Sequence, residues 1–344
     1  MAAPSESDMS ELSREFSFLK TKIAAGRSTP AEVERAFELK RLMAEIDASI
    51  STATVDWSTI APQSATVWIT PLPTRKSDLY AKRDPVRATG SVHVKIAPRP
   101  FSRGGVRVAY HARVCKSGEA TWKPYVVKQF IELKNQTRAE YLDQLETNGV
   151  AVFLAKEWMK SSEGKAAKKI GEGIKFIESR ALELTATSGG GAATPDSHWY
   201  HMEKVVPGKF EKYTDNGGWC CSKPSSRTVL HFTKWSFEYC LTPSRDFSMM
   251  ATDLQGGKQG GIGWVLTDPA MLCSDLSRFG PTNFDDAMID ICYEAAQHTL
   301  TTGRALFAGS VAKSAMRPGF SRTDDGSVWA SRKGKFRGLK EEKR

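Results

Sequence analysis

The chain has 344 residues, a length that predicts about two domains with ample sequence to bury a core. Its formal net charge is +10, which is basic enough to admit an acidic partner but too small to require one. No run approaches the roughly 20 apolar residues of a membrane-spanning helix, so no membrane span is expected.

Residues 10–50 have the pattern of a helical hairpin. Leu12, Phe16 and Ile23 recur at helical spacing in the first half. Thr29 and Glu32 then form a T-x-x-E capping box that starts the second helix. We expect the hairpin either to pack on the neighbouring domain or to dock a partner or a second copy.

The middle of the chain reads as a β-rich part followed by helices. Residues 51–100 look like a linker that runs into strands, and strands are predicted over 106–114 and 125–130. A helix is predicted over 138–161, and 165–184 is a second, mixed stretch. The glycine-rich segment 188–194 is typical of a loop between lobes or at the surface.

The second half begins with two predicted strands, 199–206 and 228–240, and a third precedes residue 253, over 247–252. A helix is predicted over 285–303, and the chain from about residue 315 is expected to be disordered. The domain boundaries that follow are a hairpin with linker (1–60), a main domain (61–315, with lobes 61–200 and 201–315) and a basic tail (316–344).

Much of the positive charge is in this tail, where residues 332–344 hold seven basic and two acidic side chains. The rest of the chain is expected to present an ordinary solvated surface. The tail leaves room for an acidic partner such as a nucleic acid, an anionic membrane or an acidic protein.

The six cysteines form no C-x-x-C pair or regular framework, and residues 1–8 lack the apolar region of a signal peptide. We therefore expect reduced thiols and a cytoplasmic protein, with the nucleus as the alternative location.

The segment from Asp253 to Asn283 carries the strongest functional signal. Asp253 and Gln255 lie two apart at the end of a predicted strand, on the same side, and Asp268 follows a second apolar run. Carboxylate and amide oxygens are the ligands that Mg²⁺ prefers, and the glycines between them let a ligand approach the backbone. The pattern favours phosphate chemistry.

A lysine lies in an earlier apolar strand, Tyr125-Val126-Val127-Lys128-Gln129-Phe130. Its stem can stay buried while its ammonium group reaches a phosphate. Taken alone, Lys128 is better explained as a lysine at the edge of a sheet.

Three motifs in this order, D-L-Q-G at 253–256, L-T-D-P at 266–269 and F-G-P-x-N at 279–283, resemble the alpha-kinases, a family of atypical protein kinases. Residues 100–110 are similar to the opening strand of that family, and residues 200–216 to the segment that connects its two lobes. The resemblance covers roughly 98–302. It implies an α+β fold with a β-rich N-lobe and a mixed α/β C-lobe, preceded here by the hairpin.

The resemblance also implies an activity, the transfer of the ATP γ-phosphate to a protein serine or threonine with Mg²⁺, and a set of roles. Asp253 matches the catalytic aspartate that orients the acceptor hydroxyl, with Lys128 and Asp268 as its catalytic partners. Gln255 and Asp268 match the Mg²⁺ ligands, and Thr267 is expected to support them. The ATP-binding residues are implied to be Arg107, Lys128, Glu203 at the adenine-binding hinge, Lys212 and Asn216.

The sequence departs from the family pattern in three places. The interval between Asp253 and Asp268 is about five residues longer than in the family, and Phe284 is followed by an aspartate rather than a glycine. Lys234 stands where a histidine ligand of a structural zinc would be, and the late helix lacks the thiolates, so we expect no structural zinc. A pseudokinase that binds ATP or a protein without catalysis is the main alternative, and a nucleic-acid-binding protein a weaker one.

Overall fold

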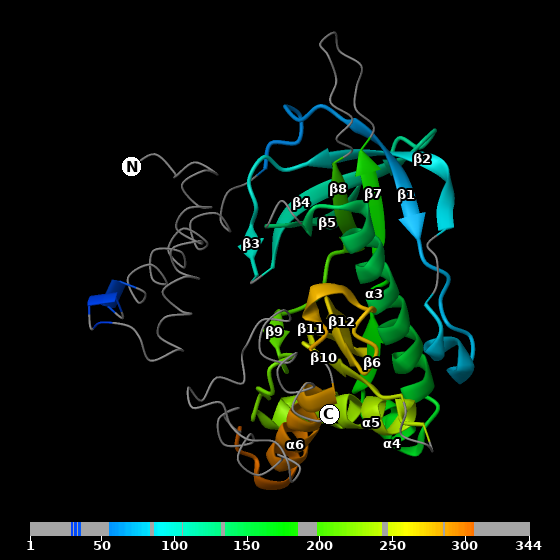
Figure 1. Ribbon diagram of the computed structural model, residues 1–344. Helices are drawn as coiled ribbons and strands as arrows, with labels where there is room; N and C mark the ends of the chain where they lie inside the picture. The colour runs from blue at the N-terminus through cyan, green and yellow to red at the C-terminus, as the bar shows by residue number, and fades with distance from the viewer. Residues whose placement is uncertain are drawn as a thin grey trace, which may run out of the picture.

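The computed structural model describes residues 55–82, 86–104, 106–131, 135–184, 198–242, 247–284 and 286–305, together with residues 29, 31, 32, 34 and 35. They form two lobes, one above the other in Figure 1. The upper lobe is built on a large sheet, and the lower lobe combines smaller sheets with helices. In this described part, no helix has the length and apolar character to cross a membrane.

The upper sheet has seven strands in the order β2-β1-β7-β8-β5-β4-β3, all paired antiparallel. β2 also pairs with β4, so the sheet curls back on itself. Apolar side chains from alternate positions, such as Val94, Val127 and Leu182, fill the interior of this curl. The strands are β1 (Gln63–Ile69), β2 (Val86–Ile96), β3 (Ser102–Arg103), β4 (Arg107–Lys116), β5 (Lys123–Phe130), β7 (Arg180–Leu184) and β8 (Trp199–Lys204).

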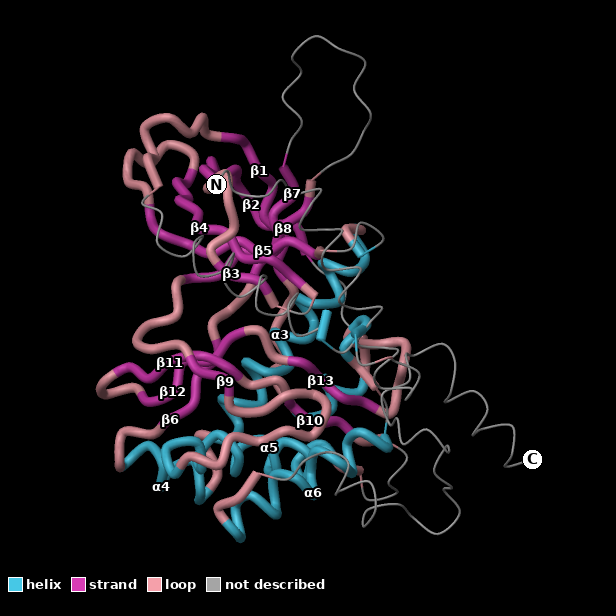
Figure 2. The backbone as a smooth tube through the Cα atoms, turned by 90° about the vertical axis from the view of Figure 1, so that its left-hand side faces the viewer, coloured by secondary structure: helices cyan, strands magenta, loops and turns pink. Residues whose placement is uncertain are grey.

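The lower lobe holds a four-stranded sheet in the order β6-β12-β11-β9 and a separate pair, β10 with β13. Helices α4, α5 and α6 lie together at the far end of this lobe, as Figure 2 shows. The strands are β6 (Gly173–Phe176), β9 (Glu211–Lys212), β10 (Met249–Thr252), β11 (Gln255–Gln259), β12 (Gly263–Thr267) and β13 (Ala270–Cys273). The helices are α4 (Ser162–Lys169), α5 (Arg227–Cys240) and α6 (Asp286–Thr302), with 3-10 turns η1 (Lys76–Tyr80), η3 (Pro224–Ser226) and η4 (Gly280–Thr282).

Helix α3 (Arg138–Trp158) runs down from the upper sheet into the lower lobe and connects the two (Figure 1). The Thr137 side chain caps its first turn by accepting a hydrogen bond from the Glu140 amide. The middle of the helix is buried on several sides, so its polar groups need partners. Glu146 pairs with Arg278 at 2.7 Å, and the Asn148 amide donates to the Ile177 carbonyl at 2.8 Å.

The strand predicted over 228–240 is wrong, because this segment is helix α5. Its β-branched and aromatic composition favoured a strand, but its buried residues follow a helical period. Val229, Phe232, Ser236 and Cys240 recur at intervals of three or four and face the core of the lower lobe. Packing of this face against the core outweighs the weak β propensity of the side chains.

The other predicted strands and helices that fall on described residues are confirmed as β4, β5, β8, β10, α3 and α6. The mixed stretch 165–184 contains the end of α4, then β6 and β7, and β6 pairs with β12 of the lower lobe. The predicted capping box is present, since the Glu32 amide donates to Thr29 Oγ1 and the Thr29 amide to Glu32 Oε2. The rest of the hairpin, the loop 188–194 and the tail lie outside the described residues.

Candidate active site

Four polar side chains lie on one face of the upper sheet, where β4, β5 and β8 run side by side. Lys128 in β5 is paired with His201 in β8, two residues before Glu203. Arg107 starts β4 and lies opposite Phe130, two residues after Lys128. Because side chains alternate along a strand, these positions share a face. Strand register alone thus brings together Arg107 and Glu203, which are 96 positions apart in the sequence.

Lys128 is 8% exposed and lies between two acids from different parts of the chain. Its Nζ contacts Glu203 Oε1 in the neighbouring strand and lies 3.5 Å from Asp268 Oδ2 in the lower lobe. The other oxygen of Glu203 accepts a hydrogen bond from Thr267 Oγ1. Thr267 therefore supports the site through Glu203, and Lys128 connects the two lobes.

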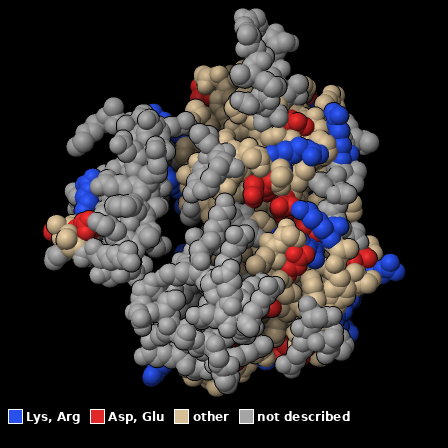
Figure 3. Space-filling view, in the orientation of Figure 1, with Lys and Arg blue, Asp and Glu red and all other residues tan. Residues whose placement is uncertain are grey.

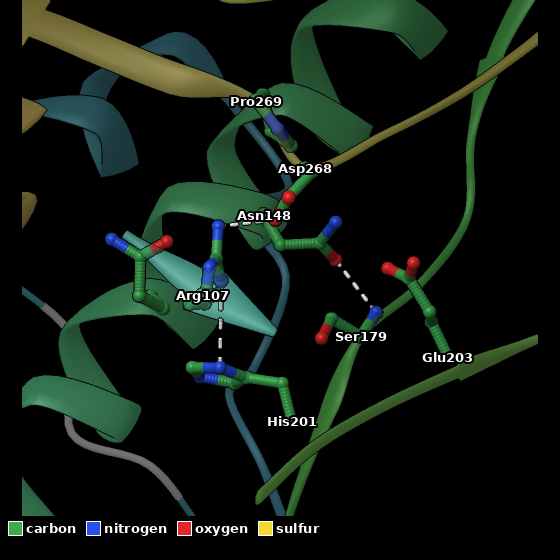
Figure 4. Close-up of a pocket in the computed structure, with 8 residues that line it drawn as sticks. Arg107, Asn148, Ser179, His201, Glu203, Asp268 and Pro269 are labelled. Carbon is green, nitrogen blue, oxygen red and sulfur yellow. Dashed lines mark hydrogen bonds and ion pairs between the residues drawn. The ribbon is translucent and has the colours of Figure 1, made fainter. Parts of the chain in front are cut away.

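Asp268 is the point where these contacts meet. Arg107 NH2 contacts its Oδ1, while Lys128 faces its Oδ2. Burial opposes ionisation of this carboxyl, but the two cations outweigh it and lower its pKa to about 2. Figure 4 shows Arg107 between Asp268 and His201 in a small pocket that Glu203 also lines. Asp268 is therefore a carboxylate across the neutral pH range.

His201 belongs to this site although the sequence analysis did not select it. Its Nε2 lies 2.8 Å from the Tyr141 carbonyl, so Nε2 carries the proton and donates it. Nδ1 then faces Arg107 NH1 at 3.5 Å as an acceptor. Burial and then the Arg107 charge lower the pKa of His201 to about 3, which keeps the ring neutral. The sequence held one signal for it: His201 lies two residues before Glu203 in a predicted strand, so the two side chains share a face.

The open end of the hairpin β11–β12 places the two aspartates near each other. Gln255 is paired with Thr267 in this antiparallel hairpin, and Asp253 and Asp268 lie just outside the paired region. Gly260 and residues 261–262 form the turn at the tip of the hairpin. A longer antiparallel hairpin moves its turn outward and leaves its open end in register.

Both aspartates have left-handed backbone conformations, with φ of 54° at Asp253 and 56° at Asp268. Aspartate tolerates this region better than most non-glycine residues do. The turn at Asp253 interrupts the strand alternation that the sequence predicted through Asp253 and Gln255. Asp253 instead faces Lys212, while the Gln255 amide faces the Asp268 carbonyl at 3.5 Å.

Gly257 provides a test of how β11 is held. A Cβ at this position would lie 2.0 Å from the Pro207 carbonyl oxygen, in the segment that leads into β9. Gly257→Ala should therefore push that segment away and lower the free energy of unfolding by about 1–3 kcal/mol. Gly260→Ala is the matched control, because nothing lies within 4 Å of a Cβ there. Urea unfolding of both variants checks this, and equal stabilities would contradict it.

Lys212 in β9 and Asp253, two residues before β11, form an ion pair with Nζ 2.6 Å from Oδ1. Burial raises the pKa of Asp253 above its ordinary value, and Lys212 opposes this rise. The nearby Asp268 and Asp215 carboxylates raise it further. The Asn216 amide donates to the Thr282 carbonyl at 3.1 Å.

The oxygen donors at the hairpin end fit a hard cation such as Mg²⁺. The Gln255 amide nitrogen lies 3.5 Å from the Asp268 backbone carbonyl, which brings its side chain to this end, and the charge of Asp268 raises the pKa of Asp253. A divalent cation between such groups would offset the repulsion of the carboxylates. In the described ranges, His, Cys, Asp and Glu side chains do not gather in groups of three or more that could hold a metal.

The position of the family's zinc ligand is occupied by a charge pair. Lys234 in α5 lies 3.1 Å from Glu238 and over the ring of Tyr293 in α6. Cys292 is buried in the apolar core between these helices, together with Leu230 and Ile289. The pair lies within α5, and Tyr293 joins it to α6, because its ring lies under Lys234 and its hydroxyl donates to Glu238 at 2.9 Å.

A sequence model of the alpha-kinase family matches residues 102–298. The chain belongs to the alpha-kinase family. It is 27% identical over 195 residues to the alpha-protein kinase vwkA of Dictyostelium discoideum, and 28% over 191 residues to myosin heavy chain kinase B of the same organism. It is also 27% identical over 181 residues to eukaryotic elongation factor 2 kinase of Caenorhabditis elegans. These matches cover 56%, 55% and 52% of this chain but 28%, 22% and 20% of the relatives, so the chain spans about a quarter of their length.

Solved structures of the alpha-kinase domain of myosin heavy chain kinase A share the fold. The complex with AMP has a TM-score of 0.52 at 18% identity, and the alignment covers 74% of this chain and 99% of that domain. The complex with ADP has a TM-score of 0.50 at 18% identity, covering 70% and 92%. The two-lobed arrangement of α3, the upper sheet and the lower lobe is thus that of an alpha-kinase domain.

Proposed function

We propose that this alpha-kinase is an active protein serine/threonine kinase that transfers the γ-phosphate of ATP to a protein hydroxyl with Mg²⁺. The observation that carries the proposal is the meeting of Arg107 and Lys128 from the upper lobe with Asp268 from the lower lobe. Phosphoryl transfer needs cations for the phosphates and carboxylates for a metal and an acceptor hydroxyl, and this site holds both kinds of group within one cluster.

In this proposal Arg107 and Lys128 bind the phosphate oxygens. Glu203 holds Lys128 at the face of the sheet, and Thr267 fixes Glu203 in turn. The contact of Glu203 with Lys128 supports a role in positioning this lysine, in addition to the place at the adenine-binding hinge that the resemblance implies. A lysine fixed in this way needs less reorganisation when the phosphates arrive.

Asp253 is proposed to accept the proton of the acceptor hydroxyl as the new bond to phosphorus forms. Its raised pKa makes it a better proton acceptor than an ordinary aspartate, while Lys212 favours the ionised form that a base requires. The leaving group is ADP. Mg²⁺ held by Gln255 and Asp268 would neutralise charge on the phosphate oxygens.

The test is transfer of label from γ-labelled ATP to the protein itself or to a generic protein substrate, followed by phosphoamino acid analysis. The proposal expects phosphoserine or phosphothreonine in the product. Labelled tyrosine alone, or no transfer at any Mg²⁺ concentration, would contradict it.

A pseudokinase that binds nucleotide without transfer is the second candidate. It is favoured by one observation: both aspartates are already paired with lysine or arginine, Asp253 with Lys212 and Asp268 with Arg107. The two candidates differ in a single result. A pseudokinase would bind ATP, measured by calorimetry, and yet transfer no label.

The proposal extends to the location and to a further partner. The six cysteines are free and buried, which suits the reducing conditions of the cytoplasm, with the nucleus as an alternative. The basic tail is proposed to bind an acidic partner. Binding to a nucleic acid or to anionic vesicles should then weaken steeply with salt and be lost on truncation before Arg332.

A further inference from the structure

The phosphate-binding cations of this site are fully engaged by the protein's own acids. Arg107 contacts one oxygen of Asp268, and Lys128 faces the other oxygen while also contacting Glu203. Two cations thus face two carboxylates in a region where the Arg107 and Lys128 side chains are only 15% and 10% exposed. The charges balance before any ligand is present.

The surroundings of Arg107 leave Asp268 as its main charged partner. On its other side lies His201, which is neutral and offers only the lone pair of Nδ1. The guanidinium group also lies over the ring of Phe130 at 5.7 Å. The position next to Arg107 and Lys128 is therefore shaped for an anion, and a carboxylate of the protein occupies it.

The two acids in the cluster differ in how they are held. Glu203 lies within β8, is 5% exposed and accepts a hydrogen bond from Thr267. Asp268 lies outside the strand, in a left-handed turn between β12 and β13, and its side chain is 22% exposed. Asp268 is the acid that can change partners without disturbing the upper sheet.

We propose that Asp268 acts as an internal substitute for phosphate, so that it and the nucleotide phosphates compete for Arg107 and Lys128. Nucleotide binding releases Asp268 from these two cations and so makes its oxygens available to a divalent metal. Metal and nucleotide would then bind cooperatively, because each favours the state in which Asp268 is separated from Arg107 and Lys128. This inference rests on the proposed function and adds a role for Asp268 before catalysis.

The experiment measures the affinity for ATP without metal, in the presence of EDTA, by calorimetry. Asp268→Asn removes the competing charge, and asparagine also tolerates a φ of 56°. The variant should bind metal-free ATP about tenfold more tightly than the natural protein does, since one opposite charge no longer holds the two cations. Adenosine has no phosphate, so its affinity should stay unchanged.

Glu211→Gln is the matched control. It also removes one negative charge, from strand β9 of the same sheet of the lower lobe. Glu211 pairs there with Lys209 and Lys223 and not with the two phosphate-binding cations. It should leave the affinity for metal-free ATP as it is. Asp268→Gly, which also suits the left-handed turn, should repeat the gain and guards against a folding defect specific to the asparagine variant.

The outcomes separate this inference from the proposed function. If the natural protein binds Mg-ATP but neither Asp268 variant binds metal-free ATP more tightly, the competition is overturned and the kinase proposal stands. An equal gain in the Glu211 variant, or for adenosine, would overturn it as well, because the effect would then be one of overall charge. If neither the natural protein nor any variant binds ATP under any condition, both proposals fail.

Discussion

Asp253→Asn should lower the rate of phosphoryl transfer by about 10²–10⁴-fold, the contribution expected of a positioned general base. The amide has nearly the shape of the carboxylate and suits the φ of 54°, so the fold should survive. It cannot accept the proton of the acceptor hydroxyl. ATP binding should be retained, because Asp253 does not pair with Arg107 or Lys128, the cations proposed to bind the phosphates. Steady-state transfer from labelled ATP, with calorimetry on the same preparation, measures both quantities.

The same conversion of an acid to an amide at Glu211 provides the comparison. Glu211 lies in β9 next to Lys212, but its carboxylate pairs with exposed lysines at the surface. Its removal should leave the transfer rate within about twofold of the natural rate, as for most surface changes. An equal fall of the transfer rate in the two variants would show that the rate depends on the net charge of this region. Asp253 would then have no specific role as a base.

Lys128→Met is the second change with a large expected effect. It removes the ammonium group that is proposed to bind the phosphates and leaves Glu203, 5% exposed, without its cationic partner. An uncompensated buried charge of this kind costs about 3–5 kcal/mol. We therefore expect both a loss of ATP binding and a large fall in the free energy of unfolding, measured by urea denaturation.

A double variant separates these two effects. Lys128→Met combined with Glu203→Gln removes both charges, and the glutamine can still accept the hydrogen bond from Thr267. Most of the lost stability should return, whereas ATP binding should not. Recovery of ATP binding in the double variant would mean that Lys128 does not contact the phosphates. A stability that stays low would mean that the unpaired Glu203 is not the cause of the loss.

Local patterns predicted most of the fold because strands and helices with a clear period follow their own sequence. The helix predicted over 138–161 is α3, and the strand over 125–130 is β5. The prediction for segment 228–240 was wrong for a physical reason. Its residue types favour a strand, but its buried side chains recur at helical spacing and pack in the lower lobe as a helix. Composition and period conflicted there, and the period was the better guide.

For the site, the sequence identified the charged groups but could not show how they pair. Arg107, Lys128 and Asp268 were each selected, and the structure brings them together. Their mutual neutralisation depends on strand register and on the left-handed turn at Asp268, which no local motif encodes. His201 was missed for the same reason, because it matters through its contact with Arg107, and strand β5 lies between the strands that carry these two residues.

The most direct test of the account is the transfer of label from γ-labelled ATP by the natural protein and by Asp268→Ala, with nucleotide binding followed in parallel. If the two lobes bind a triphosphate between Lys128 and Asp268, the natural protein should transfer label in the presence of Mg²⁺. The variant should bind ATP and transfer none. Equal transfer by both proteins would contradict the placement of the reaction at this site.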